Sequence, residues 1–190
     1  YTSDGIREIS PSAIHYFNVS DNYFIYTTVS AINIQNIIEE PTTLTLMMGG
    51  TSSMYVSLNN VYITFREPDT RTSIYRIRIE KNTINTEAHG KVPGHELNQF
   101  SMDEYNNYFR IATTTWVNGI TQNNVYILNM NLTMVGKLEN LASGENLHSA
   151  RFMGDRCYLV TFKKTDPLFV IDFSEPTTPS VLGQLEIPGY

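Results

Sequence analysis

The chain has 190 residues, of which 41% are hydrophobic and 17% are charged, and its formal net charge at pH 7 is −6. Its basic residues are scattered, which argues against a nucleic-acid partner because phosphate binding needs clustered Lys and Arg. No run of 18 apolar residues occurs, so we expect no membrane insertion in this segment. The abundance of Tyr, Ile, Val, Thr and Asn predicts an all-β protein.

Residues 1–50 predict two strands with a leading connector. The β-branched and aromatic stretch at 23–34 is typical of one long strand, and the stretch at 42–49 is typical of a second. Residues 1–22 hold turn signals and form the expected connector. No partner hairpin for this pair occurs in the sequence, so residues 1–50 predict only half of a four-stranded unit.

Residues 51–94, 95–142 and 143–190 each predict a complete unit of four antiparallel strands. In each unit the first two strands meet at a polar turn, since Asn, Asp and Gly tolerate the positive φ that hairpins require. The expected turns are Leu58 to Asn60, Asp103 to Asn107, and Gly154 to Asp155. The third strands are apolar at consecutive positions, which predicts burial on both faces.

A glycine followed by Lys or Gln and then by Val or Leu recurs in the fourth strand. Gly90 and Gly136 are 46 residues apart, and Gly136 and Gly183 are 47 apart. This period is typical of four-stranded propeller blades. The sequence therefore predicts a β-propeller fragment of about three and a half blades. Its uncovered edges imply either a larger propeller that has been cut or self-association through open blade edges.

The connector between the second and third strands varies most in length, and the middle connector is the longest. It holds Trp116, the only tryptophan, and Asn118. Variable loops on a constant scaffold commonly carry binding surfaces. Trp116 is therefore a candidate binding anchor, with packing against a neighbouring blade as the alternative.

The last unit resembles a known propeller repeat. Its apolar strand at 167–172, the turn from Asp172 to Pro176 and the later Pro179 resemble the LVIVD-type repeat. With residues 148–156 before it and 182–189 after it, the chain resembles the secreted β-propeller proteins of archaea and bacteria, which are distantly related to WD repeats. This resemblance implies a propeller that continues further, export, and an extracellular or cell-surface setting. It supplies no catalytic residues.

Structural roles explain the polar clusters better than catalysis or metal binding does. Asp103 to Asn107 offers oxygen ligands for Ca²⁺ but lacks EF-hand spacing, and an enlarged hairpin turn explains it without a metal. Asp172 and Ser174 are expected to accept backbone N–H groups and shape a turn. His95 and His148 precede the expected innermost strands, where they would line a channel or hydrogen-bond to backbone. Cys157 is expected to be a buried apolar residue, with a reactive thiol as the alternative.

No nucleophile elbow, zinc-type histidine pair or phosphate-binding glycine loop occurs, so the sequence predicts no catalytic residues, no metal and no cofactor. We expect a non-catalytic interaction scaffold, part of a larger exported propeller protein, that binds a protein or carbohydrate partner. Trp116, Asn118 and His148 are the candidate binding residues. The alternative is the propeller portion of an extracellular enzyme whose catalytic residues lie outside this segment.

Overall fold

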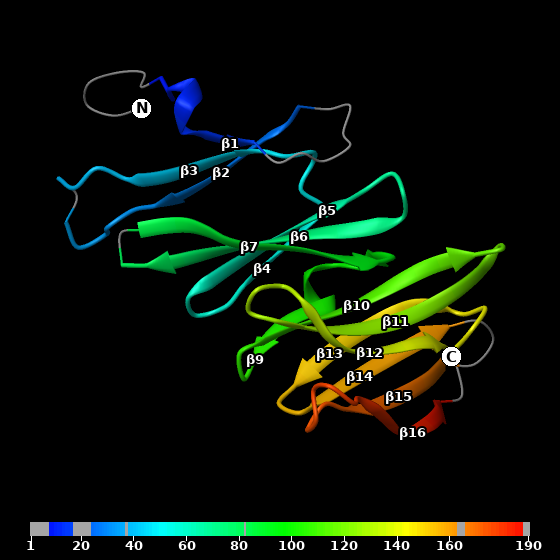
Figure 1. Ribbon diagram of the computed structural model, residues 1–190. Coiled ribbons are helices and arrows are strands. Elements are labelled where there is room, and N and C mark those ends of the chain that lie inside the picture. The colour runs from blue at the N-terminus through cyan, green and yellow to red at the C-terminus, as the bar shows by residue number, and fades with distance from the viewer. Residues whose placement is uncertain (1–7, 17–23, 37, 82, 163–165, 188–190) are drawn as a thin grey trace.

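The computed structural model describes residues 8–16, 24–36, 38–81, 83–162 and 166–187, and it confirms the all-β expectation. Four sheets follow one another in chain order and stack face against face (Figure 1). The described part of the chain contains helical structure only as the two 3₁₀ turns η1 (Pro11–Ala13) and η2 (Gln99–Ser101). This arrangement is that of consecutive propeller blades.

The second and fourth sheets are four-stranded antiparallel meanders. The second consists of β4 (Ser53–Val56), β5 (Asn60–Arg66), β6 (Arg71–Glu80) and β7 (Thr83–Pro93). The fourth consists of β13 (Asn146–Met153), β14 (Arg156–Phe162), β15 (Asp166–Asp172) and β16 (Ser180–Ile187). In both sheets the strand order follows the chain order, as hairpin-connected blades require.

In the third sheet, two short strands take the place of a single innermost strand. It consists of β8 (His95–Glu96), β9 (Met102–Tyr105), β10 (Tyr108–Val117), β11 (Ile120–Asn129) and β12 (Met134–Leu141). Both β8 and β9 pair with β10, and η2 lies between them. The side chain of Asn98 accepts a hydrogen bond of 2.9 Å from the Phe100 N–H, which caps this turn. The expected strand at 98–102 is therefore wrong over its first four residues.

The first sheet is smaller than a blade and only partly follows the expectation. Strands β2 (Tyr26–Ala31) and β3 (Thr42–Met47) are antiparallel, as predicted, but shorter than the stretches that indicated them. Strand β1 (Ile14–Tyr16) pairs parallel to β3. It lies within the segment that was expected to be connector. A three-residue strand is too short to display a period of two, so the sequence pattern did not reveal it.

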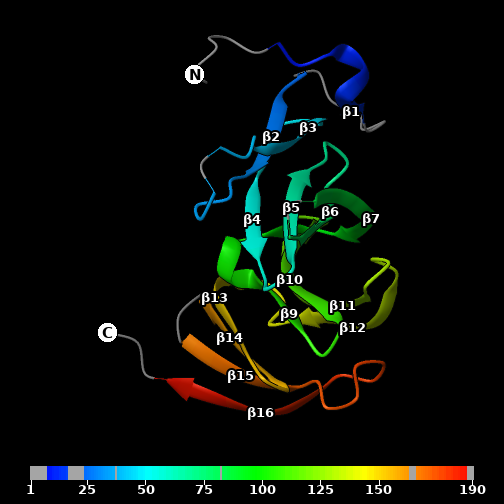
Figure 2. The ribbon, with the colours of Figure 1, turned by 90° about the vertical axis from the view of Figure 1, so that its left-hand side faces the viewer.

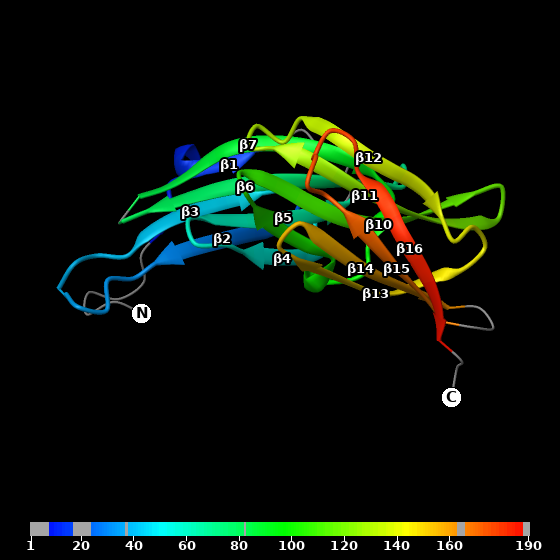
Figure 3. The same ribbon diagram turned by 90° about the horizontal axis from the view of Figure 1, so that it is seen from below.

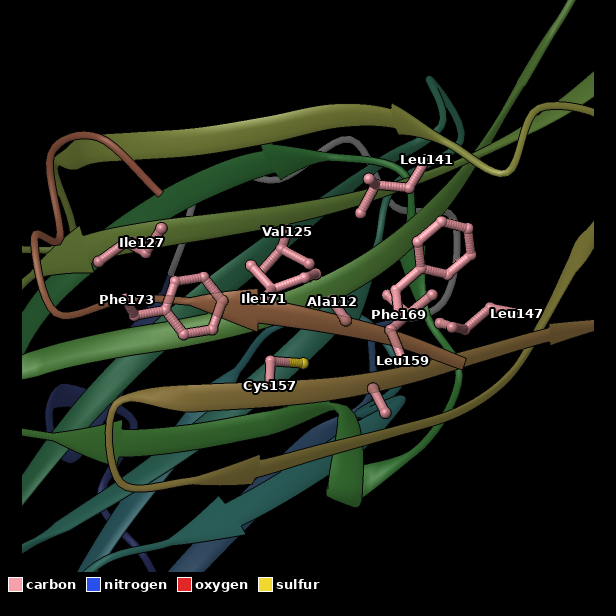
Figure 4. Packing of buried hydrophobic residues seen from close by; sticks show 11 residues of the cluster. Ala112, Val125, Ile127, Leu141, Leu147, Cys157, Leu159, Phe169, Ile171 and Phe173 are labelled. Carbon is pink, nitrogen blue, oxygen red and sulfur yellow. The ribbon is translucent and has the colours of Figure 1, made fainter. Parts of the chain in front are cut away.

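The core consists of three apolar layers, one between each pair of successive sheets. The layer between the third and fourth sheets contains Val125 and Ile127 from β11, and Leu159 and Ile171 from the fourth sheet, all fully buried (Figure 4). Cys157 lies in the same layer, as predicted. Because a middle sheet contributes to the layers on both its faces, its third strand is apolar at consecutive positions.

The repeated glycines lie where successive blades approach most closely. A Cβ built on Gly90 would overlap the carbonyl oxygen of Leu132, and one on Gly136 would overlap that of Pro176. In each case the oxygen belongs to the connection between the third and fourth strands of the next sheet. Only glycine leaves room for that backbone. Among the described residues, nothing lies within 4 Å of such an atom on Gly183.

Candidate binding site

Trp116 and Asn118 lie in a β-hairpin and not in the expected loop. Trp116 belongs to β10, whose pairing with β11 continues to the pair formed by Val117 and Ile120. Asn118 and Gly119 form the two-residue turn, with φ of 51° and 78°. Asn-Gly between β-branched residues is a strong hairpin signal, so this hairpin was detectable within the segment that was expected to be a connector.

The hairpin holds Trp116 in solvent. The ladder of β10 and β11 has ten residue pairs, compared with seven between β5 and β6. Figures 1 and 3 show this hairpin at the right-hand end of the molecule. The Trp116 side chain is 68% exposed. The sequence left open whether Trp116 is exposed or packs on a neighbouring blade, and the structure shows it exposed.

His148 lies in β13, which contacts both strands of this hairpin. Its ring is 6.5 Å from that of Phe162, in an edge-on arrangement. Two residues earlier, Asn146 accepts a hydrogen bond of 3.4 Å from Thr121, the cross-strand neighbour of Trp116. The structure thus places two candidate residues on the hairpin and the third on the strand beside it. The expectation that His148 precedes the innermost strand is wrong, because it lies within that strand.

His95 also lies within an innermost strand, β8, where it pairs with Thr114. Its Nδ1 atom is buried and has no hydrogen-bond partner among the described residues. Burial, and secondarily the charge of Arg66, lowers the pKa of His95. The imidazole is therefore neutral over a wider pH range than an exposed histidine.

The acidic residues of the expected turn at 103–107 belong instead to β9, and only Asn106 and Asn107 form the turn. The Glu104 carboxylate accepts hydrogen bonds from Ser57 (2.8 Å), Asn60 (2.9 Å) and Tyr62 (2.6 Å), which joins the second and third sheets. Protein donors thus converge on one Glu104 oxygen, Oε2, and Arg110 donates to both carboxylate oxygens of Asp103. Within the described ranges, no three His, Cys, Asp or Glu side chains converge as metal ligands.

A second site, which we call the junction pocket, opens between the third and fourth sheets, where the β9–β10 turn, the β13–β14 turn and the β15–β16 connection meet. Its volume is about 220 Å³. It is lined by Tyr105, Asn106, Tyr108, Arg110, Ile127, Asp155, Phe173, Ser174 and Pro176. The sequence pattern did not indicate this pocket. A charged residue inside an apolar strand, Arg110, was the available signal.

Arg110 forms the charged floor of the junction pocket, and its side chain is only 3% exposed. It donates two hydrogen bonds to Asp103, of 2.7 and 2.5 Å, and one of 2.7 Å to the carbonyl of Gly154. The rings of Tyr105 and Phe173 lie 5.1 and 5.3 Å from the guanidinium. These contacts fix the cation and neutralise it locally. Burial raises the pKa of Asp103, and Arg110 opposes that shift.

The rim of the junction pocket is polar and shaped by turns. The Ser174 N–H donates a hydrogen bond of 2.8 Å to Asp172, which confirms the predicted turn-forming role of Asp172. Asp172 also pairs with Arg156. Backbone N–H donation lowers the pKa of Asp172, so the turn keeps an ionised carboxylate at neutral pH.

A shallower groove, which we call the inner groove, crosses the innermost strands. Its volume is about 480 Å³, and Met54, Val56, Phe100 and Arg151 are among its lining residues. Figure 2 shows η2 between β4 and β13, and Phe100 of this turn is one of the residues that line the groove. The Arg151 guanidinium lies 4.2 Å from the Phe100 ring centre. The groove therefore combines exposed apolar side chains with one cation.

Stacked four-stranded antiparallel sheets with their innermost strands along one groove define a β-propeller. The model of the β-propeller domain family matches residues 1–190, and the chain belongs to that family. An uncharacterised protein of Methanocaldococcus jannaschii is 50% identical over 122 residues, which are 63% of this chain and 19% of that protein. Another, from Archaeoglobus fulgidus, is 43% identical over 120 residues, which are 62% of this chain and 19% of that protein. The matched segment is therefore about a fifth of each relative's length.

Among the described residues, no helix has the length and apolar character needed to cross a membrane.

Proposed function

We propose that the chain is a non-catalytic interaction scaffold within a larger exported β-propeller protein, and that it binds a protein or carbohydrate partner outside the cell or at its surface. The single observation that carries this proposal is the exposed Trp116 on a hairpin that reaches beyond the blade. Large aromatic side chains held in a fixed position are the commonest anchors of binding surfaces.

The hairpin presents apolar side chains on both of its faces. Directly opposed residues of an antiparallel pair point to the same face, and neighbours along a strand point to opposite faces. Trp116 therefore points to one face, while Val117 (45% exposed) and Ile120 (48% exposed) point to the other. A partner that covers both faces must surround the tip.

From Ile111 to its tip, the hairpin carries no charge that would oppose such burial. No charged residue occurs between Ile111 and Val135, although 17% of the whole chain is charged. Cores of interfaces are depleted in charged residues and enriched in aromatic ones. The composition of this segment supports a binding role at its tip.

The proposal is tested with a glycan array and a displayed random-peptide library, each probed with the 190-residue chain. We expect selected ligands to lose at least tenfold in affinity with Trp116→Ala, the typical loss at an anchor residue. Phe24→Ala is the matched control, because Phe24 is 69% exposed but lies two residues before β2 of the first sheet. Selection of no ligand, or ligands that bind Trp116→Ala unchanged, would contradict the proposal.

A further inference from the structure

The junction pocket has the size of a site for one small ligand. Its volume of about 220 Å³ lies below the range of roughly 300 to 1,000 Å³ that is typical of sites for drug-sized molecules. Aromatic rings of Tyr105 and Phe173 provide apolar surface, and the side chains of Asn106, Asp155 and Ser174 provide polar groups at the rim. The pocket therefore suits a compact molecule with both an apolar face and several polar groups.

The charges around the junction pocket favour a neutral ligand. The positive charge of Arg110 is already neutralised by Asp103, so an anion finds no free cation at the floor. An anion would also meet the exposed Asp155 at the rim and the net charge of the chain, −6. A cation would meet the buried Arg110, which already contacts the aromatic rings.

The hydrogen-bonding groups include both donors and acceptors. A guanidinium has five N–H groups, and three of those on Arg110 donate to Asp103 and Gly154, so that two donate to no acceptor among the residues that the structure describes. Asn106 and Ser174 each donate and accept, and Asp155 accepts. Vicinal hydroxyl groups, which also donate and accept, match this set.

We propose that the junction pocket binds one neutral sugar ring, with the C–H face of the ring against the aromatic side chains and its hydroxyl groups toward the rim and Arg110. This inference rests on the carbohydrate branch of the proposed function and assigns it a site distinct from the Trp116 hairpin.

The test is saturation-transfer NMR and calorimetry with the methyl glycosides of glucose, mannose and galactose, and with N-acetylglucosamine. Glucuronate and glucosamine serve as the anionic and cationic comparisons. We expect at least one neutral sugar to bind with a Kd of about 1 mM, as a few hydrogen bonds and one ring contact allow. The charged sugars are expected to bind more weakly.

Two variants locate the binding. Asn106→Gly removes the amide but keeps the positive φ of 49° that the turn requires, and it is expected to weaken binding roughly 3- to 10-fold. Asp155→Ala removes a charged acceptor and is expected to weaken binding roughly 10- to 100-fold. Asn140→Gly is the matched control, because Asn140 also has a positive φ, of 63°, but lines neither the junction pocket nor the inner groove.

Absence of binding by all four neutral sugars would overturn this inference, as would tighter binding of glucuronate or an equal loss with Asn140→Gly. None of these results would affect a ligand whose binding depends on Trp116, so the proposed function is tested separately. Conversely, sugar binding that depends on Asn106 and not on Trp116 would support the junction pocket alone.

Discussion

Arg110 donates hydrogen bonds from two of its nitrogen atoms to the two carboxylate oxygens of Asp103, at 2.7 and 2.5 Å, inside the boundary between two blades. A third hydrogen bond, to the carbonyl of Gly154, connects the same guanidinium to the next sheet. One side chain thus holds two neighbouring sheets together and closes the floor of the junction pocket.

Removal of this buried cation should destabilise the fold strongly. Arg110→Ala leaves Asp103, whose side chain is 19% exposed, without its guanidinium partner and removes a buried cation, and we expect the free energy of unfolding to fall by about 3–5 kcal/mol. The matched control is Arg78→Ala, because both Arg78 and its partner Glu80 are exposed, and we expect a loss below about 1 kcal/mol. Urea denaturation followed by circular dichroism measures both. Equal losses would show that the Arg110–Asp103 pair is not structural.

The outer-strand glycines offer a matched pair for testing the close approach of the blades. Gly136→Ala places a methyl group against the carbonyl of Pro176, and we expect a loss of about 1–3 kcal/mol in the free energy of unfolding. Gly183→Ala in the 190-residue chain meets open space, so stability should change by less than about 0.5 kcal/mol. Denaturation curves of the two variants and of the unchanged chain measure these losses. A Gly136→Ala variant as stable as Gly183→Ala would refute the packing explanation.

The Cys157 thiol should be inert in the folded chain. Burial raises the pKa of Cys157 to about 12 from its ordinary value of 9.0. At pH 8 the thiolate, which is the reactive form, is therefore scarce. We expect a chromogenic disulfide reagent to react only after unfolding in urea. Rapid labelling of the native chain would contradict the burial.

The same shift predicts a dependence of stability on pH. Above about pH 9 the unfolded thiol loses its proton while the folded thiol keeps it, so this group's contribution to stability is lost progressively as pH rises toward 12. Cys157→Ala should be less stable at pH 8 because it leaves a cavity, but it should lack this part of the alkaline decline. Denaturation of both chains between pH 8 and 10.5 measures the difference.

Trp116 is the only tryptophan, so its fluorescence reports on the hairpin tip alone. Because the side chain is 68% exposed, we expect acrylamide to quench the native and the urea-unfolded chain to a similar extent. Strong protection in the native chain would indicate that Trp116 packs against a neighbouring blade. That result would also remove the observation on which the proposed function depends.

The blade pattern was predictable because a strand buried on both faces is apolar at consecutive positions, as at Val125 to Leu128. The glycine repeat also marks the outer strand of each blade. Short or locally capped elements were not predictable. Strand β1 has only three residues and pairs in parallel with β3. The 3₁₀ turn η2 depends on a single capping residue, Asn98. The hairpin carrying Trp116 was predictable in principle from Asn118 and Gly119.

The junction pocket could not be predicted, because its walls come from three separate turns whose proximity depends on how two sheets stack. Arg110 is conspicuous in an apolar strand, but its partner Asp103 was assigned to a turn. Only the register of β9 against β10, which pairs Arg110 directly with Asp103, shows that the two residues belong together.

The glycine contacts have a consequence for how blades can diverge. Gly90 and Gly136 each face a main-chain oxygen, supplied by Leu132 in one case and by Pro176 in the other. Since every residue type carries that oxygen, the contact with the glycine does not itself require a particular side chain at the partner position. Leu132 is restricted for other reasons, because its side chain is buried in the layer between the second and third sheets. The recurring requirement at this junction is therefore the glycine, whereas the partner residue is selected by its own surroundings.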